Sequence, residues 1–474
     1  MSFCTWQYFA FFVSVFSAHW LLPSDRLRVW LLVAASVVFY ASWNPWLAAL
    51  ICASTTVDYL LARGIDASPS ARMRRRLMVT SVVMNLALLG FFKYANFFLG
   101  SIEQALRAAG AARSLPVVRV VLPIGISFYT FEAISYVVDV YRGRCRAERR
   151  LEHLLLFILF FPHLVAGPIV RGRHFLPQIR RPKRWNSARV NLGLQLVAVG
   201  LFKKLAIADR VALYADPVFA NPELYRTSAL WIAAIAYSLQ IYCDFSGYTD
   251  IARGSAHMLG YKLPLNFSFP FLAPNISAFW RRWNITLSTW LRDYVYVPLG
   301  GSRGSLAATV RNLMITMALG GLWHGAKWTF VVWGMVHGAL LAVYHSWRAL
   351  AGATLPVRRG LQASVATVAA TALTFAAVMI AFVVFRAESL SLAGTMLAGM
   401  TSVRTGLTGP IDKRIVWLAL IVVGAGHIVS RRVGLRRAFT QLPPELVGAA
   451  HGALATLALL LGVDGSRAFI YFQF

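Results

Sequence analysis

Residues 361–385 read LQASVATVAATALTFAAVMIAFVVF, a stretch without Asp, Glu, Lys or Arg. A helix needs about 20 mostly apolar residues to cross a hydrocarbon core of about 30 Å. This stretch is therefore long and apolar enough to cross a membrane as one helix. Because a membrane offers no water to backbone polar groups, a helix is also the conformation that satisfies them internally.

Similar apolar runs follow one another along almost the whole chain, which is 58% hydrophobic and 14% charged with a mean hydropathy of +0.60. This composition leaves no room for a separate water-soluble domain. We therefore predict an all-α polytopic membrane protein of about 11–13 helices, folded as a single membrane-embedded domain over residues 1–474. The predicted spans are residues 6–22, 28–43, 46–62, 77–99, 120–141, 191–211, 228–248, 305–324, 328–347, 361–385, 414–430 and 446–463.

The formal net charge of +29 comes mostly from Lys and Arg in short stretches between the apolar runs. This pattern is typical of cytoplasmic loops in membrane proteins. No nucleic-acid recognition module accompanies the charge, so we expect membrane lipid and not nucleic acid as the partner. The same rule places the arginines within 63–76 and 142–150 in the cytoplasm and the N-terminus outside it. The first basic residue is Arg26, so residues 6–22 are expected to be a retained first span.

The apolar segment 151–170 lies between two basic stretches, 142–150 and 171–184, that should both be cytoplasmic. Pro162 and the pair Gly167-Pro168 interrupt this segment. Broken backbone at membrane depth is tolerated where protein or a water-filled cavity covers it. We predict that 151–170 is a re-entrant segment, which enters the membrane and returns to the same side.

Residues 276–294 form the second region that is not expected to cross the membrane. Apolar residues recur there at three- and four-residue spacing, which places them on one arc of a helix. Basic residues fall on the other side, so we predict an interfacial helix with a wet basic face. The apolar residues are Ile276, Phe279, Trp280, Trp283, Leu287, Trp290, Leu291 and Tyr294.

His324 is the strongest candidate for chemistry, since ionisable groups at membrane depth are expensive and are often functional. It ends an apolar run and is followed by Gly325. An imidazole titrates near neutrality and can take a proton from an attacking hydroxyl. Asn284, on the edge of the predicted interfacial helix, could orient that imidazole or stabilise an oxyanion. Taken alone, each residue fits a structural role better, His324 as a satisfied core histidine and Asn284 as a helix-surface asparagine.

Other polar residues give weaker signals. Asp250 and Arg253 are three residues apart and can pair on a helix, which favours a structural role for them. Paired carboxylates of a glycosidase have no further support in the sequence. The remaining histidines show no zinc-ligand spacing, and the four cysteines form no C-x-x-C pair, so no metal site is expected.

Several segments together resemble the membrane-bound O-acyltransferase family, and within it the bacterial branch that acetylates alginate and related exopolysaccharides. The resemblance covers about residues 1–350, with a motif-bearing core of about 120–347, and the closing FIYFQF at 469–474 is also similar. It implies that His324 is the catalytic histidine. The matching motifs are LPIGISFYTF at 122–131, FPHLVAGPI at 161–169, YCDFSGYTDIAR at 242–253, FWRRWN at 279–284, WLRDY at 290–294 and GLWHGA at 321–326.

The resemblance also implies a reaction. A cytoplasmic thioester, with acetyl-CoA as the expected donor substrate and no bound cofactor, gives its acyl group to a hydroxyl that arrives from outside. A periplasmic acetyltransferase partner and a polysaccharide synthesis and export complex are implied, as is the bacterial inner membrane. The branch usually carries a second histidine where this chain has Asn284, whereas eukaryotic members often have asparagine. This difference puts a mechanism with two imidazoles in doubt.

Three arginines, Arg281, Arg282 and Arg292, are candidates for binding the donor's phosphates, because guanidinium matches phosphate geometry. Contact with lipid headgroups is an equally good explanation of these residues. Two other functions stay open. One is transfer of a different acyl group, such as D-alanine to teichoic acid. The other is a polysaccharide or lipid transporter, although the inverted repeats typical of many transporters are not evident here.

Overall fold

The computed structural model describes residues 1, 3–111, 114–118, 121–351, 360–433, 443–462 and 469–470. Within these ranges the chain is helical, and a single isolated bridge between Tyr225 and Leu407 is the only β-type pairing. The prediction of an all-α polytopic membrane protein is confirmed. Residues 471–474 of the closing motif lie outside the described ranges.

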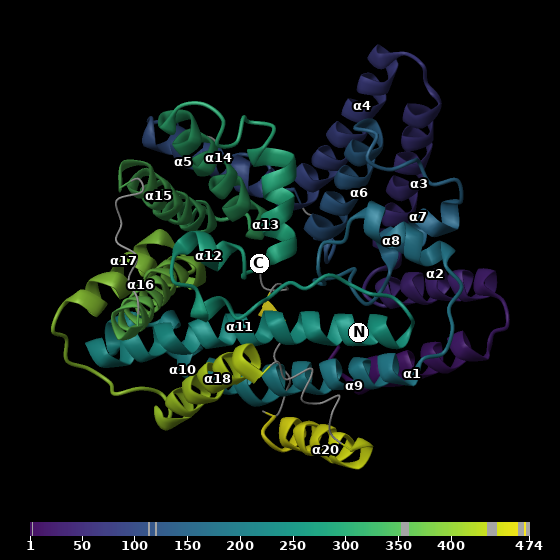
Figure 1. The fold of residues 1–474 in the computed structure, drawn as a ribbon. Helices are drawn as coiled ribbons and strands as arrows, with labels where there is room; N and C mark the ends of the chain where they lie inside the picture. The colour runs from purple at the N-terminus through teal and green to yellow at the C-terminus, as the bar shows by residue number, and fades with distance from the viewer. Residues whose placement is uncertain are drawn as a thin grey trace. The chain divides into compact units, whose positions relative to one another are not determined.

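Figure 1 shows the helices along the chain. Those labelled η are π-helical or 3₁₀ stretches. In chain order the elements are α1 Trp6–Leu21, α2 Asp25–Ala41, α3 Pro45–Ala67, α4 Ala71–Leu89, η1 Gly90–Tyr94, α5 Ala95–Ala108, α6 Ile126–Tyr141, α7 Leu151–Leu159, α8 Gly172–Arg180, α9 Ser187–Leu201, η2 Phe202–Ala208, α10 Asp209–Ala220, η3 Pro222–Leu224, α11 Thr227–Met258, η4 Pro270–Leu272, α12 Ile276–Trp280, α13 Ile285–Leu291, η5 Arg292–Tyr296, α14 Leu306–His324, α15 Trp328–Ala351, α16 Gly360–Arg386, α17 Leu390–Thr401, α18 Arg414–Val433 and α20 Pro444–Leu460.

Seven helices in the described ranges are long and apolar enough to cross a membrane. This number is below the 11–13 that the apolar runs predict. Helix length explains part of the difference, since α1, α2, α6 and α20 form where spans are expected but contain 16, 17, 16 and 17 residues. Helix α11, with 32 residues, is long enough but is not one of the seven. The seven helices are Pro45–Ala67, Ala71–Ala108, Ser187–Ala220, Leu306–His324, Trp328–Leu350, Ser364–Arg386 and Arg414–Arg431.

The chain divides into two compact units. Unit 1 comprises Met1–Val197 with Thr249–Pro264, and unit 2 comprises Ala198–Tyr248 with Leu265–Phe474. In unit 1, α3 packs against α4 and α6. In unit 2, α14 packs along α15, and α15 packs against α12 and α16. The candidate residues His324 and Asn284 belong to unit 2.

Local signals explain where individual helices begin. Asn44 caps α3 by accepting hydrogen bonds from the backbone N–H groups of Trp46 and Leu47, and Pro45 occupies the first helical position. The Ser305 hydroxyl caps α14 in the same way by accepting from the Ala308 N–H. These caps satisfy N–H groups that have no partner inside the helix.

Residues 151–170 contain a short helix followed by irregular backbone. Helix α7 has nine residues and is about 13 Å long, too short to cross a hydrocarbon core. Residues 160–171 are buried in protein. The Glu132 carboxylate accepts a hydrogen bond of 2.7 Å from the Val170 N–H and lies 3.2 Å from Nε2 of His163. The broken backbone is thus covered and paired, as such backbone requires at membrane depth.

The re-entrant path of 151–170 stays a prediction. It requires both ends of the segment to lie on the same side of the membrane. Single cysteines at exposed Arg150 and Arg173, introduced in a chain lacking the four native cysteines, should react with a membrane-impermeant maleimide from the same side. Labelling from opposite sides would show that the segment crosses the membrane. Arg72→Cys, at an exposed position expected in the cytoplasm, is the reference.

Candidate functional site

His324 is the last residue of α14, and two glycines set its position. A Cβ atom on Gly321 would lie 2.1 Å from the Phe330 carbonyl oxygen, and one on Gly334 would lie 2.2 Å from the Met317 carbonyl oxygen. Real Cβ atoms do not approach backbone so closely, so α14 and α15 can pack at this distance only where both positions are glycine. Figure 1 shows the two helices side by side. The chain leaves α14 at Gly325, whose extended backbone ends the helix.

Aromatic side chains surround the His324 imidazole, which is 4% exposed. Its ring centroid lies 5.0 Å from Trp323, 5.1 Å from Trp333 on α15 and 5.2 Å from Phe385 on α16. All three rings meet the imidazole edge to face. Such packing fixes the plane of the ring and excludes water from its faces.

The single helix expected over 276–294 is interrupted. Helix α12 ends at Trp280, and α13 begins at Ile285 after a turn. Asn284 adopts a left-handed conformation with φ +41°, which is uncommon for a residue other than glycine but tolerated best by Asn and Asp. The apolar arc is buried as expected except at Tyr294, which is half-buried, and Asn284 lies within the core (1% exposed) and not on the helix surface.

The Asn284 side chain has a donor without a partner. Its Nδ2 atom is buried, and no described residue hydrogen-bonds to it. Left-handed backbone costs about 1–3 kcal/mol, and an unpaired buried donor adds a further penalty. Both features make this conformation of Asn284 destabilising, so the surrounding packing must hold it in place.

Three more buried side chains near His324 share this property, and we call Trp280, Trp333 and His337 the indole–imidazole cluster. Their ring centroids lie 5.8 Å apart for Trp280 and Trp333, 5.1 Å for Trp280 and His337, and 4.7 Å for Trp333 and His337. Neither indole N–H nor either ring nitrogen of His337 has a hydrogen-bond partner among the described residues. Buried polar groups are normally paired, so these unpaired groups, which lie close to His324, are an exception to the rule.

A chain of ring contacts links the Asn284 turn to His324. Trp283, next to Asn284, lies 5.3 Å from Phe382. Phe382 lies 6.4 Å from Phe385, which in turn contacts the His324 imidazole. The two predicted site residues therefore belong to one aromatic core, built from α12, α14, α15 and α16.

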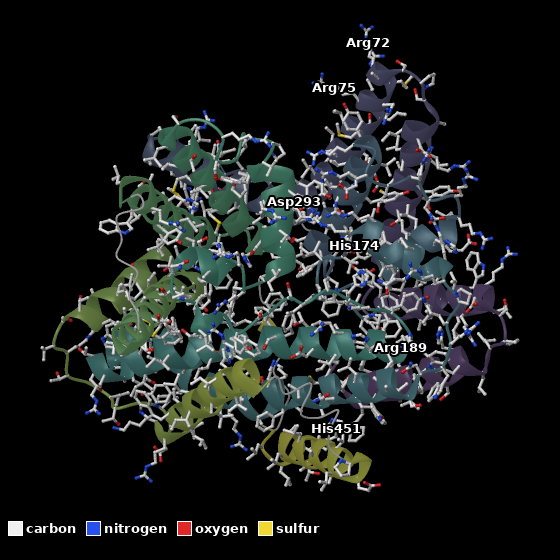
Figure 2. All side chains as sticks on the ribbon, viewed as in Figure 1. Arg72, Arg75, His174, Arg189, Asp293 and His451 are labelled. Carbon is white, nitrogen blue, oxygen red and sulfur yellow. The ribbon has the colours of Figure 1, made fainter. Side chains whose placement is uncertain are left out.

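The three arginines predicted to bind the donor differ in their surroundings. Arg281 donates to the Ser277 hydroxyl at 2.7 Å, and Arg282 donates to the Leu272 carbonyl at 2.7 Å. Partial burial, and then the positive charges of Arg431 and Arg281, lower the pKa of Arg282. Arg292 instead donates to the carboxylate of Asp293, which Figure 2 labels. The structure thus groups Arg281 and Arg282 with Arg431, while Arg292 is paired within its own helix.

Comparison with known proteins identifies the family of this chain. The family model described as MBOAT, membrane-bound O-acyltransferase family, matches residues 150–384. The probable alginate O-acetylase AlgI of Azotobacter vinelandii is 38% identical over 434 residues, which cover 91% of this chain and 84% of that protein. The chain belongs to the membrane-bound O-acyltransferase family. It is therefore an O-acyltransferase and a multi-pass membrane protein.

Two further relatives of this O-acyltransferase differ in their sequence identity to it and in the share of the chain that they cover. The peptidoglycan O-acetyltransferase of Helicobacter pylori is 36% identical over 408 residues, 81% of this chain and 74% of that protein. The teichoic acid D-alanyltransferase of Bacillus subtilis is 29% identical over 235 residues, 47% of this chain and 58% of that protein.

The acyltransferase also buries charges that its sequence does not pair by spacing. Lys204, in η2, lies 2.9 Å from carboxylate oxygens of both Asp209 and Asp244, and Asp244 also accepts a hydrogen bond from the Ile470 N–H at 2.8 Å. Asp244 is thus part of a paired structural network. The predicted pairing of Asp250 with Arg253 is confirmed at 3.3 Å.

The sequence interpretation missed the indole–imidazole cluster of the acyltransferase. Trp333 and His337 are four residues apart and so share one face of α15. That spacing was available as a signal, but it is equally typical of ordinary core packing. The contact with Trp280 joins residues more than fifty positions apart and leaves no local pattern.

Gly334→Ala tests how far the glycine contact positions His324. The added methyl group must push α15 away from the Met317 carbonyl, so we expect a loss of about 1–3 kcal/mol in stability and reduced acyl transfer. Thermal unfolding of the purified protein and a transfer assay measure the two effects. Gly394→Ala is the matched control because its Cβ meets open space. Equal stability and activity of the two variants would contradict this role.

Proposed function

We propose that this chain transfers an acetyl group from a thioester donor, acetyl-CoA, to a hydroxyl, for O-acetylation of an exported polysaccharide such as alginate. The names and coverage of the relatives from Azotobacter vinelandii and Helicobacter pylori support acetylation of a polysaccharide. The observation that carries the proposal is the gathering of buried, unpaired donors around His324. Burying a polar group without a hydrogen-bond partner costs free energy, so a bound substrate that pairs with these groups would remove that cost.

The proposed reaction assigns two proton transfers to His324. Its imidazole takes the proton of the acceptor hydroxyl while the hydroxyl oxygen attacks the thioester carbonyl carbon. The carbonyl oxygen becomes an oxyanion as the new C–O bond forms. The intermediate then collapses, the C–S bond breaks, and the imidazolium returns its proton to the departing thiolate. The products are an ester and a free thiol, with no net uptake of protons.

The unpaired N–H donors could stabilise the oxyanion that forms in the proposed reaction. Trp280, Trp333 and Asn284 each carry an N–H group that is held by packing and points at no protein acceptor among the described residues. Preorganised donors in a site without water stabilise developing negative charge far more strongly than donors in solution.

The proposed function also requires a binding site for the donor, an orientation in the membrane and a partner protein. Arg281 and Arg282, with Arg431 nearby, would hold the phosphates of the donor, whereas Arg292 is already paired with Asp293. The bacterial inner membrane with the N-terminus in the periplasm would put these basic residues on the donor's side. A periplasmic acetyltransferase would accept the acetyl group or pass it on to the polymer.

Transfer of D-alanine to teichoic acid is the second candidate. The similarity to the Bacillus subtilis D-alanyltransferase covers 47% of this chain, whereas the similarity to AlgI covers 91%. The extended similarity favours acetylation. A transporter is not supported, because the family membership makes the chain an enzyme.

His324→Ala should lower acetyl transfer by about 10²–10⁴-fold, the usual contribution of general acid–base catalysis. Membranes supplied with radiolabelled acetyl-CoA and polysaccharide acceptor provide the measurement. His345→Ala is the matched control, because it removes a half-buried imidazole from the same helix bundle without touching the aromatic core. Native-rate transfer by a correctly inserted His324→Ala protein would exclude this histidine from the chemistry.

Trp333→Phe tests the indole donor separately from the aromatic packing. The variant keeps a ring beside His324 but removes the N–H, so we expect kcat to fall by about 10²-fold or more while protein abundance stays near normal. Trp347→Phe, at an exposed position of the same helix, provides the control. If both variants keep the wild-type kcat, the indole takes no part in stabilising the transition state.

A further inference from the structure

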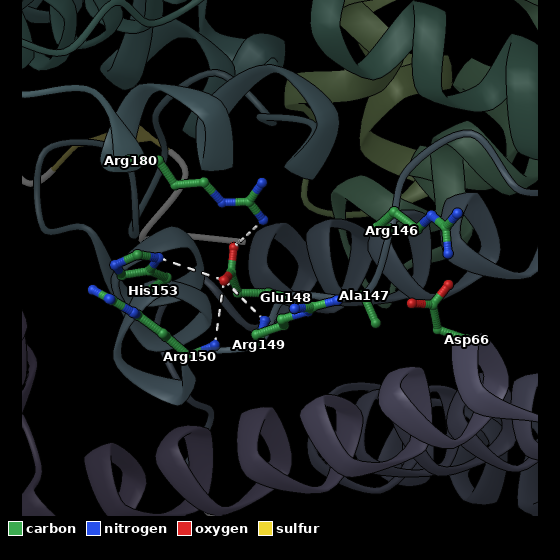
Figure 3. A pocket seen from close by; sticks show the side chains of 8 residues that line it. All are labelled: Asp66, Arg146, Ala147, Glu148, Arg149, Arg150, His153 and Arg180. Atoms are coloured by element: carbon green, nitrogen blue, oxygen red, sulfur yellow. Dashed lines mark hydrogen bonds and ion pairs between the residues drawn. The ribbon is translucent and has the colours of Figure 1, made fainter.

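A second polar site lies in unit 1, apart from the residues used above. It is a cavity of about 620 Å³ lined by charged side chains from α3, the loop between α6 and α7, α7 itself and α8. Figure 3 shows Asp66 and Arg146 on one side of it, with Arg180, Glu148 and His153 on the other. The lining residues are Asp66, Arg146, Ala147, Glu148, Arg149, Arg150, His153 and Arg180.

Glu148 is the buried anchor of this cavity. One carboxylate oxygen accepts hydrogen bonds from the backbone N–H groups of Arg149 and Arg150 at 2.9 and 3.2 Å, and His153 lies 3.5 Å from it. The other oxygen accepts from Arg180 at 2.6 Å. Burial alone would raise the pKa of Glu148, but the bonds from His153, Arg180 and the backbone lower it to about 2. Both oxygens of this carboxylate are therefore occupied.

The loop that carries the arginines is held firmly. The Tyr136 hydroxyl accepts a hydrogen bond of 2.8 Å from the Glu148 N–H, and the Tyr59 hydroxyl donates to the Arg149 carbonyl at 2.7 Å. Arg63 donates in turn to the Tyr59 hydroxyl at 3.2 Å. A site whose backbone is fixed in advance loses little conformational freedom when a ligand binds.

Positive charge exceeds negative charge in the lining. Four arginines and two carboxylates line the cavity, and one of these carboxylates, Glu148, is already used by Arg180 and the backbone. Arg146, Arg149 and Arg150 make no ion pair with any described residue. The excess of two positive charges matches a phosphate monoester, which carries about −1.5 to −2 at neutral pH, better than a singly charged carboxylate. Guanidinium forks also fit phosphate oxygens in pairs.

We propose that this cavity binds a phosphate group, with Arg146, Arg149 and Arg180 as its ligands and Glu148 as the residue that positions them. The phosphate could belong to a soluble molecule or to a phospholipid headgroup at the membrane surface. The site is independent of the proposed function, since it uses no residue of the His324 core.

The test measures binding and not turnover. The purified full-length chain carrying His324→Ala is titrated calorimetrically with pyrophosphate and with inorganic phosphate, and separately mixed with phosphatidylcholine vesicles with and without phosphatidylglycerol. The double variant R146Q/R149Q should bind the preferred probe at least about tenfold more weakly, since charge-assisted hydrogen bonds contribute on that scale. Preference for a soluble probe or for the anionic vesicles identifies the source of the phosphate.

A control variant distinguishes binding in the cavity from nonspecific attraction to positive surface charge. R72Q/R75Q removes two arginines from the exposed start of α4 in the same unit (Figure 2), and it should bind as the parent does. Equal loss in both double variants, or no loss in R146Q/R149Q, would overturn the proposal. Asp66→Asn removes a negative charge from the lining and should tighten binding. Misfolding would weaken binding, so it cannot account for this result. Unchanged or weaker binding by Asp66→Asn would also count against the site.

Discussion

The contact between α14 and α15 is the constraint on which the catalytic region depends. Gly321 and Gly334 let the two backbones approach to a distance that no other residue allows. In a membrane, helices gain little from excluding lipid, so close van der Waals contact between small residues provides much of the attraction between them. The contact brings Trp333 of one helix against His324 at the end of the other. The imidazole therefore sits on a rigid support and not on a flexible loop.

Buried polar groups in this protein fall into two kinds. Lys204 with its two carboxylates, and Glu132 with His163 and the Val170 N–H, are paired within the protein and hold irregular or π-helical backbone in place. Asn284 and the indole–imidazole cluster are buried without partners among the described residues. In a low-dielectric interior the difference is large, because unpaired groups are destabilising there while paired ones are not. The contrast is consistent with the proposal that Asn284 and the indole–imidazole cluster take part in acyl transfer, while the paired groups hold the fold.

The sequence predicts those features that depend on local composition. Apolar runs locate the helices, and the run that ends at His324 matches α14 within one residue of its start. Periodicity over 276–294 finds the buried arc, yet it cannot detect the break at Asn284, since a turn that keeps the same faces inward preserves the spacing. The pairing of Lys204 with Asp244 joins residues 40 positions apart, and the Glu148 cavity joins three separate segments. Such contacts come from tertiary packing, which local pattern does not encode.

The hydrogen bonds of Glu148 have a consequence for the response of the loop to acid. A carboxylate whose pKa is lowered by folding stabilises the folded state above its unfolded pKa, and this stabilisation disappears as pH falls through the folded value. For Glu148 the folded value is about 2, so the loss falls below about pH 4.3, the ordinary value for glutamate. The turn that begins α7 is consequently insensitive to mild acidification of the solution around it. Acid strong enough to neutralise this anchor would release the backbone of Arg149 and Arg150 together.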